Sequence, residues 1–373
     1  MDWYKKTSLV QQGNKDKEIW IREDNQNVNK YNIDVYLGKK TDLLSLKKNI
    51  VEKIKKNIEY YQQSRTELYE QELMEDVKSC PVCSSSSKET KLQTSIFGAN
   101  YVQCNVCSHV YVIKRPLQKA IHNFYLNNIT YAATYTDKEA AESRLNAIAV
   151  PWTKWMIEVF EKQYGRKPKK VLDVGSGAGH FVEACRREGI EAYGIELSES
   201  SRKFAKEIWG FEMDGRNIND VIDEYSDVDV VTFWGLLEHT PNPGEILNSA
   251  YDILNKGNRE GIVISKLPRW NSLSSAIQTL STDSVIRHLD PMGHIMAFTD
   301  ASAAELYTKN GFDPIAAWYY GMDVYETLMQ IGNKVDSYDH FTKTGSLQVD
   351  LQQFIDEVRY SDGLTLVGIP QNK

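Results

Sequence analysis

The chain of 373 residues predicts an α/β fold, in which a mostly parallel sheet is covered by helices. Three observations predict it. A short apolar segment at 171–174 runs into a glycine-rich turn and then into a helical pattern. Further apolar segments alternate with amphipathic ones up to about residue 320. Ahead of this unit, two C-x-x-C pairs predict a separate small module.

The glycine-rich turn has the sequence Asp173-Val174-Gly175-Ser176-Gly177-Ala178-Gly179. Its glycines let the backbone turn sharply and approach a ligand closely. A strand, a tight loop and a helix N-terminus together form a cradle for a nucleotide-type cofactor. The dinucleotide fingerprint G-x-G-x-x-G is not fulfilled, because its third glycine would fall at His180. The carboxylate of Asp173 suits a cofactor with a cationic amino-acid end better than a pyrophosphate.

The segments that follow continue the pattern in order. A second strand at 191–197 carries Glu196, about twenty residues past the turn, where an acid can accept hydrogen bonds from both ribose hydroxyls. A helix at 200–209 precedes Asn217 and Ile218. A fourth strand begins at 229 and ends in Glu238-His239, and a fifth covers 261–268. The aromatic segment 311–320 predicts the final pair of strands.

Together these segments resemble motif I and a Glu-His variant of motif IV of the class I S-adenosylmethionine (SAM) methyltransferases. The resemblance covers residues 151–325 and implies a Rossmann-like, mostly parallel sheet of seven strands. Asn217 stands where the family usually has an acid against adenine. The alternative is another Rossmann-like domain with a different nucleotide, which the match of four successive elements disfavours. The cofactor-binding residues that the resemblance implies are Asp173, Gly175, Ser176, Gly177, Gly179, Glu196, Leu197, Asn217, Ile218, Trp234 and Leu236.

His239 is the candidate general base. It follows the fourth strand at its carboxyl end, the edge where ligands bind in open α/β sheets. Imidazole titrates near neutrality, which suits proton removal from an acceptor. Glu238 would orient His239 or face the acceptor directly. In the alternative interpretation, both residues only shape the following loop at 240–243.

Three further residues are candidate substrate contacts. Arg269 follows the fifth strand at the same edge and could bind a sugar ring or an anionic group. His294 lies in an insertion after that strand and either lines the acceptor pocket or is a buried structural histidine. Tyr131 belongs to a helical bridge at 116–150, which could fold over the cofactor as a lid. Aromatic side chains in such a bridge could equally serve packing alone.

The cysteine pairs predict a zinc ribbon at 77–115. Each pair can place two thiolates on one tight turn, and two such turns can close a tetrahedron around zinc. Four thiolates leave no open position, so the site would be structural. Free thiols or an iron–sulfur cluster are the alternatives. The predicted zinc ligands are Cys80, Cys83, Cys104 and Cys107.

The two ends of the chain are less informative. Residues 1–76 form an N-terminal arm, in which leucines and isoleucines at helical spacing predict one long helix at 41–76. This helix would pack on the body of the protein or mediate a homodimer. Residues 326–373 are expected to be a C-terminal extension.

Composition limits the partners. The net charge of -7 and the pI of about 5.6 disfavour a general nucleic-acid binder. No apolar run reaches the roughly 18 residues that a membrane helix needs, and no apolar signal segment follows the N-terminus. We therefore expect a cytoplasmic protein, for which paired cysteines indicate metal ligands rather than disulfides.

A zinc ribbon ahead of a Glu-His methyltransferase resembles bacterial enzymes that methylate sugar nucleotides or polysaccharide and natural-product precursors. In keto-sugar C-methyltransferases of this kind the motif histidine is the proposed base. Those enzymes carry a further large C-terminal domain, which this chain does not match, so O-methylation of a sugar or another small metabolite fits equally. A zinc-ribbon RNA methyltransferase is the second hypothesis. A SAM-binding scaffold without turnover is the third.

Overall fold

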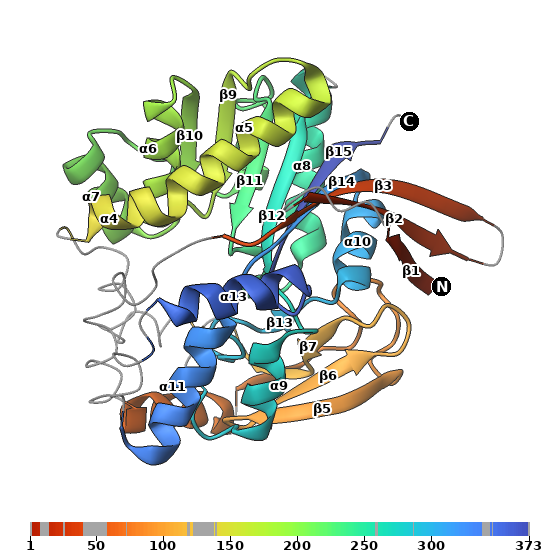
Figure 1. The fold of residues 1–373 in the computed structure, drawn as a ribbon, viewed down its shortest axis with the longest axis vertical. Coiled ribbons are helices and arrows are strands. Elements are labelled where there is room, and N and C mark those ends of the chain that lie inside the picture. Colours follow the sequence, from red (N-terminus) through yellow and green to blue (C-terminus); the bar gives the residue numbers. More distant parts are fainter. Residues whose placement is uncertain are drawn as a thin grey trace.

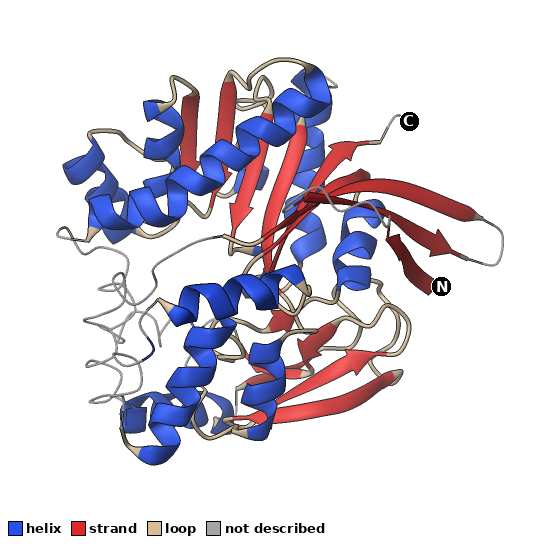
Figure 2. Ribbon diagram, viewed as in Figure 1, coloured by secondary structure: helices blue, strands red, loops and turns tan. Residues whose placement is uncertain are grey.

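One mixed sheet of nine strands runs through the protein in the order β1-β2-β3-β14-β15-β12-β11-β9-β10 (Figure 1). The α/β prediction is confirmed, and helices cover the sheet (Figure 2). The computed structural model describes residues 2–7, 15–24, 27–39, 58–71, 73–117, 120–121, 138, 140–257, 260–285, 287–337, 344 and 346–371.

Four neighbouring strands are parallel and form the half of the sheet with the glycine-rich turn. They are β9 (Lys170–Val174), β10 (Glu191–Ile195), β11 (Val230–Trp234) and β12 (Ile262–Pro268). On one face Val171 packs in a cluster with α5 (Val150–Tyr164) and α6 (His180–Arg187). On the other, Leu172 packs in a cluster with α8 (Pro243–Gly257) and α10 (Asp300–Lys309). Burial on both faces explains the nearly continuous apolar sequence of these strands.

The other half of the sheet corrects two expectations. The sheet has nine strands of mixed direction instead of seven mostly parallel ones. The sequence analysis places two strands within 311–320, whereas one strand, β14 (Phe312–Tyr319), occupies this segment. Pro314 lies at a bulge in this strand, where a missing N–H is tolerated. The partner is β15 (Gly363–Pro370), which inserts antiparallel between β14 and β12. The segment 326–373 therefore contributes a central strand of the sheet.

The first 38 residues extend the sheet. They contain β1 (Asp2–Thr7), β2 (Lys15–Glu23) and β3 (Val28–Leu37). The last of these pairs in parallel with β14. Gly38 and Lys39, which follow it, therefore lie beside the end of β14. Ion pairs from Arg22 to Glu305 (3.0 Å) and from Arg359 to Asp16 (2.5 Å) join this part to α10 and to the segment before β15.

The cysteine module packs below the main sheet (Figure 1). Its strands β5 (Thr90–Ile96), β6 (Ala99–Cys104) and β7 (Val110–Val112) form a second sheet, in the order β13-β7-β6-β5. The fourth strand, β13 (Met296–Ala297), comes from the segment after β12. A third, two-stranded sheet joins β4 (Met74–Asp76) to β8 (Lys114–Pro116). Because the apolar residues of the module belong to the same cluster as Phe298 and α10, the module shares its core with the α/β unit.

The remaining described elements are α4 (Ala141–Arg144), the π-helical turn η1 (Leu145–Ala149), α7 (Glu199–Trp209), the 3₁₀ turns η2 (Ile218–Asp220) and η3 (Leu237–His239), α9 (Leu273–Leu280), α11 (Asp323–Val335) and α13 (Leu347–Glu357). Within the helix expected at 41–76, residues 58–70 are helical, and the helix ends before β4. Its part at 41–57, with the proposed dimer contact, and most of the bridge at 116–150 lie outside the described residues. Among the described helices, none has both the length and the apolar character to span a membrane.

Candidate active site

The glycine-rich turn joins β9 to α6 at the carboxyl end of the parallel strands. Gly175, Gly177 and Gly179 have φ angles of 73°, 53° and 76°, in the left-handed region that favours glycine. A Cβ on Gly179 would lie 2.9 Å from Cζ of Phe211, and one on Gly175 would lie 3.0 Å from Cδ1 of Leu236. The turn therefore requires glycine both for its backbone conformation and for its packing.

Two carboxylates flank this turn. Glu196 follows β10, and its two oxygens accept hydrogen bonds from the backbone N–H groups of Gly177 and Ser198, both at 2.7 Å. Asp173 on β9 is buried and accepts from Thr232 Oγ1 at 2.7 Å. Burial raises the pKa of Asp173 to about 7, against the hydrogen bonds from Thr232 and Ser176, which lower it. The two acids predicted from the sequence thus lie at the same edge of the sheet.

The residues expected near the adenine and the methionine part lie around the same edge. Leu197 is 62% exposed beside the turn, and Ile218 is buried at the start of η2. Asn217 is exposed just before it and makes no side-chain capping hydrogen bond. Leu236 packs over Gly175, and Trp234 stacks on Trp152 with ring centroids 4.3 Å apart.

Glu238, His239 and His294 form one cluster although 55 residues separate the two histidines. Nε2 of each histidine lies 3.9 Å from Glu238 Oε1, and the imidazole centroids are 5.1 Å apart. Oε2 of Glu238 is buried without a hydrogen-bond partner. One ligand atom of each residue lies within 4.8 Å of the others, so the cluster also has the donor set of a divalent metal site.

The cysteine module holds His294 in place. The Tyr101 hydroxyl on β6 lies 2.8 Å from the carbonyl oxygen of His294, and the N–H of Val112 donates to the carbonyl of Ile295 at 3.0 Å. The imidazole Nδ1 of His294 lies 2.8 Å from the carbonyl oxygen of His288. That contact makes Nδ1 the protonated nitrogen and leaves Nε2 of the neutral ring as a hydrogen-bond acceptor. Burial lowers the pKa of His294 well below its usual value, with His239 acting in the same direction.

One other predicted residue, Arg269, is held within the fold. Arg269 is buried; its Nε lies 2.6 Å from Asp300 Oδ1, and its Nη1 donates to backbone carbonyls, so its guanidinium supports the fold and does not project toward an acceptor. His288 is fully buried beside Ser275 Oγ, at 2.8 Å, and burial lowers its pKa to about 4. Tyr131 lies outside the described residues.

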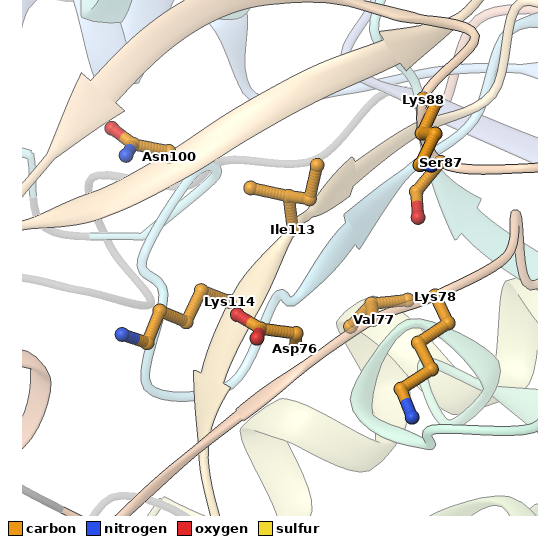
Figure 3. A pocket seen from close by; sticks show the side chains of 8 residues that line it. All are labelled: Asp76, Val77, Lys78, Ser87, Lys88, Asn100, Ile113 and Lys114. Atoms are coloured by element: carbon orange, nitrogen blue, oxygen red, sulfur yellow. The ribbon is translucent and has the colours of Figure 1, made fainter.

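Two surface pockets adjoin this region and the cysteine module. The smaller, of about 140 Å³, brings His239 together with Arg115, Pro116 and Met292. The larger, of about 390 Å³, lies on the cysteine module and includes three lysines (Lys78, Lys88 and Lys114), whose side chains point apart (Figure 3). The smaller pocket is lined by the candidate base His239, whereas His239 does not line the larger one.

The four predicted zinc ligands lie together. The Sγ atoms of Cys80 and Cys107 are 3.6 Å apart, and so are those of Cys83 and Cys104. Zinc–sulfur bonds of about 2.3 Å in a tetrahedron require sulfurs about 3.8 Å apart, so the four thiolates fit a zinc ion. His109 is fully buried outside this set, and burial lowers its pKa to about 3.

Lys39 and Lys266 lie at the same end of the sheet and are not among the residues that the sequence analysis selects. Lys266 lies on β12 at the carboxyl end of the sheet, and Lys39 follows β3. The signal that could have found Lys266 is a lysine near the end of an otherwise apolar strand. No local pattern brings Lys39 to the same place, because the pairing of β3 with β14 does so.

Comparison with known proteins agrees with this geometry. A family model described as "Methyltransferase domain" matches residues 148–317. The ubiquinone biosynthesis O-methyltransferase of Idiomarina loihiensis is 32% identical over 168 residues, which cover 39% of this chain and 67% of that protein. Its counterpart in Psychrobacter arcticus is 28% identical over 165 residues, 40% of this chain and 61% of that protein. A SAM-dependent methyltransferase from Archaeoglobus fulgidus has 18% identity and a TM-score of 0.40, over 61% of this chain and 97% of that one.

The glycine turn, its two acids and the parallel strands define a class I methyltransferase domain. The chain belongs to the SAM-dependent methyltransferases. It spans about three fifths to two thirds of the length of the curated relatives that it matches.

Proposed function

We propose that the protein transfers a methyl group from SAM to a small-molecule acceptor, most simply to a hydroxyl oxygen. The observation that carries the proposal is the position of Glu238 and His239, which follow β11 at the sheet edge that also holds Asp173 and Glu196. The curated relatives are O-methyltransferases. In this proposal the acceptor lies at that edge, close to the cofactor.

The cofactor is assigned to the glycine-rich turn. Glu196 would accept hydrogen bonds from the ribose hydroxyls, and Asp173 would face the cationic amino-acid end. Leu197, Asn217 and Ile218 would surround adenine. When bound, SAM supplies an electrophilic methyl group, so the hard chemistry is the cofactor's own. The chain contributes alignment of the acceptor with that methyl and removal of the acceptor proton.

Proton removal is assigned to His239, which borders the small pocket and is partly exposed. Glu238 lies 3.9 Å from it and would stabilise the imidazolium that forms. His294, a neutral acceptor at Nε2, would accept a hydrogen bond from the acceptor hydroxyl. If the same three side chains held a metal ion, activity would disappear in EDTA and return with a divalent cation.

The acceptor class is proposed in two steps. A small molecule is favoured over RNA, because the three lysines of the cysteine module diverge and the chain is acidic. Within small molecules we retain a sugar-type acceptor, such as a sugar nucleotide or polysaccharide precursor, beside the phenolic type that the relatives' name suggests. The four cysteines are assigned to a structural zinc ion that stabilises the wall carrying His294.

The test uses methyl-labelled SAM with separate small-molecule and RNA extracts. We expect label in small molecules, and about a 100-fold or larger loss of turnover in His239→Ala, as for removal of a general base. SAM affinity should stay the same in this variant. The control is Lys203→Ala, since the Lys203 side chain on α7 is 77% exposed. Label in RNA, or an unchanged rate in both His239→Ala and Glu238→Gln, would overturn the proposal.

A further inference from the structure

Two lysines without close counter-ions lie at the carboxyl end of the sheet. Lys266 on β12 is opposite Trp234 on β11 and Thr365 on β15, so these three side chains share one face of the sheet. The Nζ of Lys39 lies 5.8 Å from the ring centroid of Trp152 and 5.6 Å from that of Tyr320. Since Trp152 stacks on Trp234, one aromatic surface connects the two lysines.

The charges around the two ammonium groups are unbalanced. Among the described residues, no carboxylate oxygen lies within the 4.0 Å of an ion pair with either Nζ. Asp362 and Glu238 act on Lys266 from further away, and Asp362 is already paired with Arg287. Asp356 accepts a side-chain hydrogen bond from Gln352 at 2.8 Å and forms no ion pair with the ammonium group of Lys39.

Such an arrangement costs free energy when nothing is bound, because a partly buried ammonium group lacks both water and a partner. Burial lowers the pKa of Lys39 to about 7, and the nearby charge of Lys266 lowers it further in the same direction. Burial likewise lowers the pKa of Lys266. Buried ionisable groups with shifted pKa values cluster at functional sites. The indole Nε1 of Trp234 adds a buried donor without a hydrogen-bond partner at the same place.

We propose that Lys39 and Lys266 bind an anionic group of the methyl acceptor, a carboxylate or a phosphate, with the Trp152 and Trp234 rings beside it. The inference rests on the proposed methyl transfer and restricts its acceptor to anions. Lys266 lies next to Trp234, and Glu238 follows Trp234 by four residues, so the anion would be held along the edge that carries the candidate base. Lys39 and Lys266 are positioning residues in this assignment.

The experiment uses inorganic phosphate and benzoate as probes, at constant ionic strength and with S-adenosylhomocysteine present. Their affinities are measured by calorimetry for the wild type, Lys39→Met and Lys266→Met. We expect saturable binding of at least one probe to the wild type and a tenfold or larger loss in each variant. The probe that binds more tightly identifies phosphate or carboxylate. Lys203→Met is the control, since the Lys203 side chain on α7 is 77% exposed.

Thermal unfolding without probes separates ligand binding from a structural role. A ligand site predicts that either substitution raises the melting temperature, because it removes an unbalanced buried charge. A lower melting temperature with unchanged probe affinity would overturn the inference, and so would no saturable binding of either probe to the wild type. SAM affinity and label transfer are measured alongside. If SAM binding and label transfer are normal but neither probe binds, only the assignment of the anion site is wrong. If SAM itself does not bind, the proposed function is wrong.

Discussion

The two halves of the sheet edge differ in their ionisable side chains. The proposed cofactor half, around β9 and β10, presents the carboxyl groups of Asp173 and Glu196. The proposed acceptor half, around β11 and β12, presents Lys39, Lys266 and two histidines, with Glu238 between them. A cationic cofactor suits the first half and an anionic acceptor suits the second. One sheet edge can therefore favour a cationic ligand at one half and an anionic ligand at the other, before either is bound.

The largest effect is expected from removal of zinc, which tests whether the two halves of the sheet edge are independent. Structural zinc contributes on the order of 10 kcal/mol in small zinc modules. Cys80→Ser should therefore lose the metal and loosen β6 and β7, which hold His294 through Tyr101. Turnover should disappear, while SAM affinity should fall less than turnover, because no described strand of the module pairs with β9 or β10, although both parts contribute to one apolar core.

Metal content by mass spectrometry, hydrogen exchange and SAM calorimetry measure these effects together. Ser87→Ala, a change in the same module outside the four thiolates, is the control. Equal loss of SAM binding and of zinc would show that the two halves are not independent. If the zinc-free protein kept its full stability in EDTA, the structural role proposed for zinc would be wrong.

Glu196→Ala should act on the cofactor half alone. Loss of hydrogen bonds from two ribose hydroxyls to a charged acceptor costs about 2–3 kcal/mol, so the Kd for SAM should rise about 30- to 150-fold. Probe binding at Lys39 and Lys266 should stay the same. Glu199→Ala, in the first turn of α7, provides a matched loss of charge outside the proposed contact. Normal SAM affinity in Glu196→Ala would contradict the ribose assignment.

The two halves also differ in how far the sequence predicts them. The cofactor half lies within one continuous stretch, from Asp173 to Ile218, where a local turn and strand ends fix the positions of the acids. The acceptor half is assembled from residues far apart in the chain. Lys39 arrives through the parallel pairing of β3 with β14, and β15 inserts beside Lys266 from the far C-terminal segment. Such long-range pairings leave no local pattern, which is why the predicted strand count was wrong.

The smallest expected effect concerns pH, and it tests whether Asp173 meets a cation. Because burial raises the pKa of Asp173 to about 7, the free protein holds this group largely protonated at pH 5.5. A cationic cofactor group beside the carboxylate favours ionisation, so SAM affinity should rise about tenfold between pH 5.5 and 7 and then level off. Stability of the free protein should change in the opposite sense. A carboxyl whose folded pKa is raised favours the folded state below its unfolded pKa, and this contribution is lost as pH rises to about 7.

Calorimetry of SAM binding across this range, in the wild type and in Asp173→Asn, isolates the contribution of Asp173. The amide keeps the shape of the side chain and its contact with Thr232 but cannot ionise. Its SAM affinity should be low at every pH, near the wild-type value at pH 5.5. A wild-type slope that persists in Asp173→Asn would place the titrating group elsewhere. The carboxylate would then serve only to tie β9 to β11, and the charge separation along the sheet edge would rest on Glu196 alone.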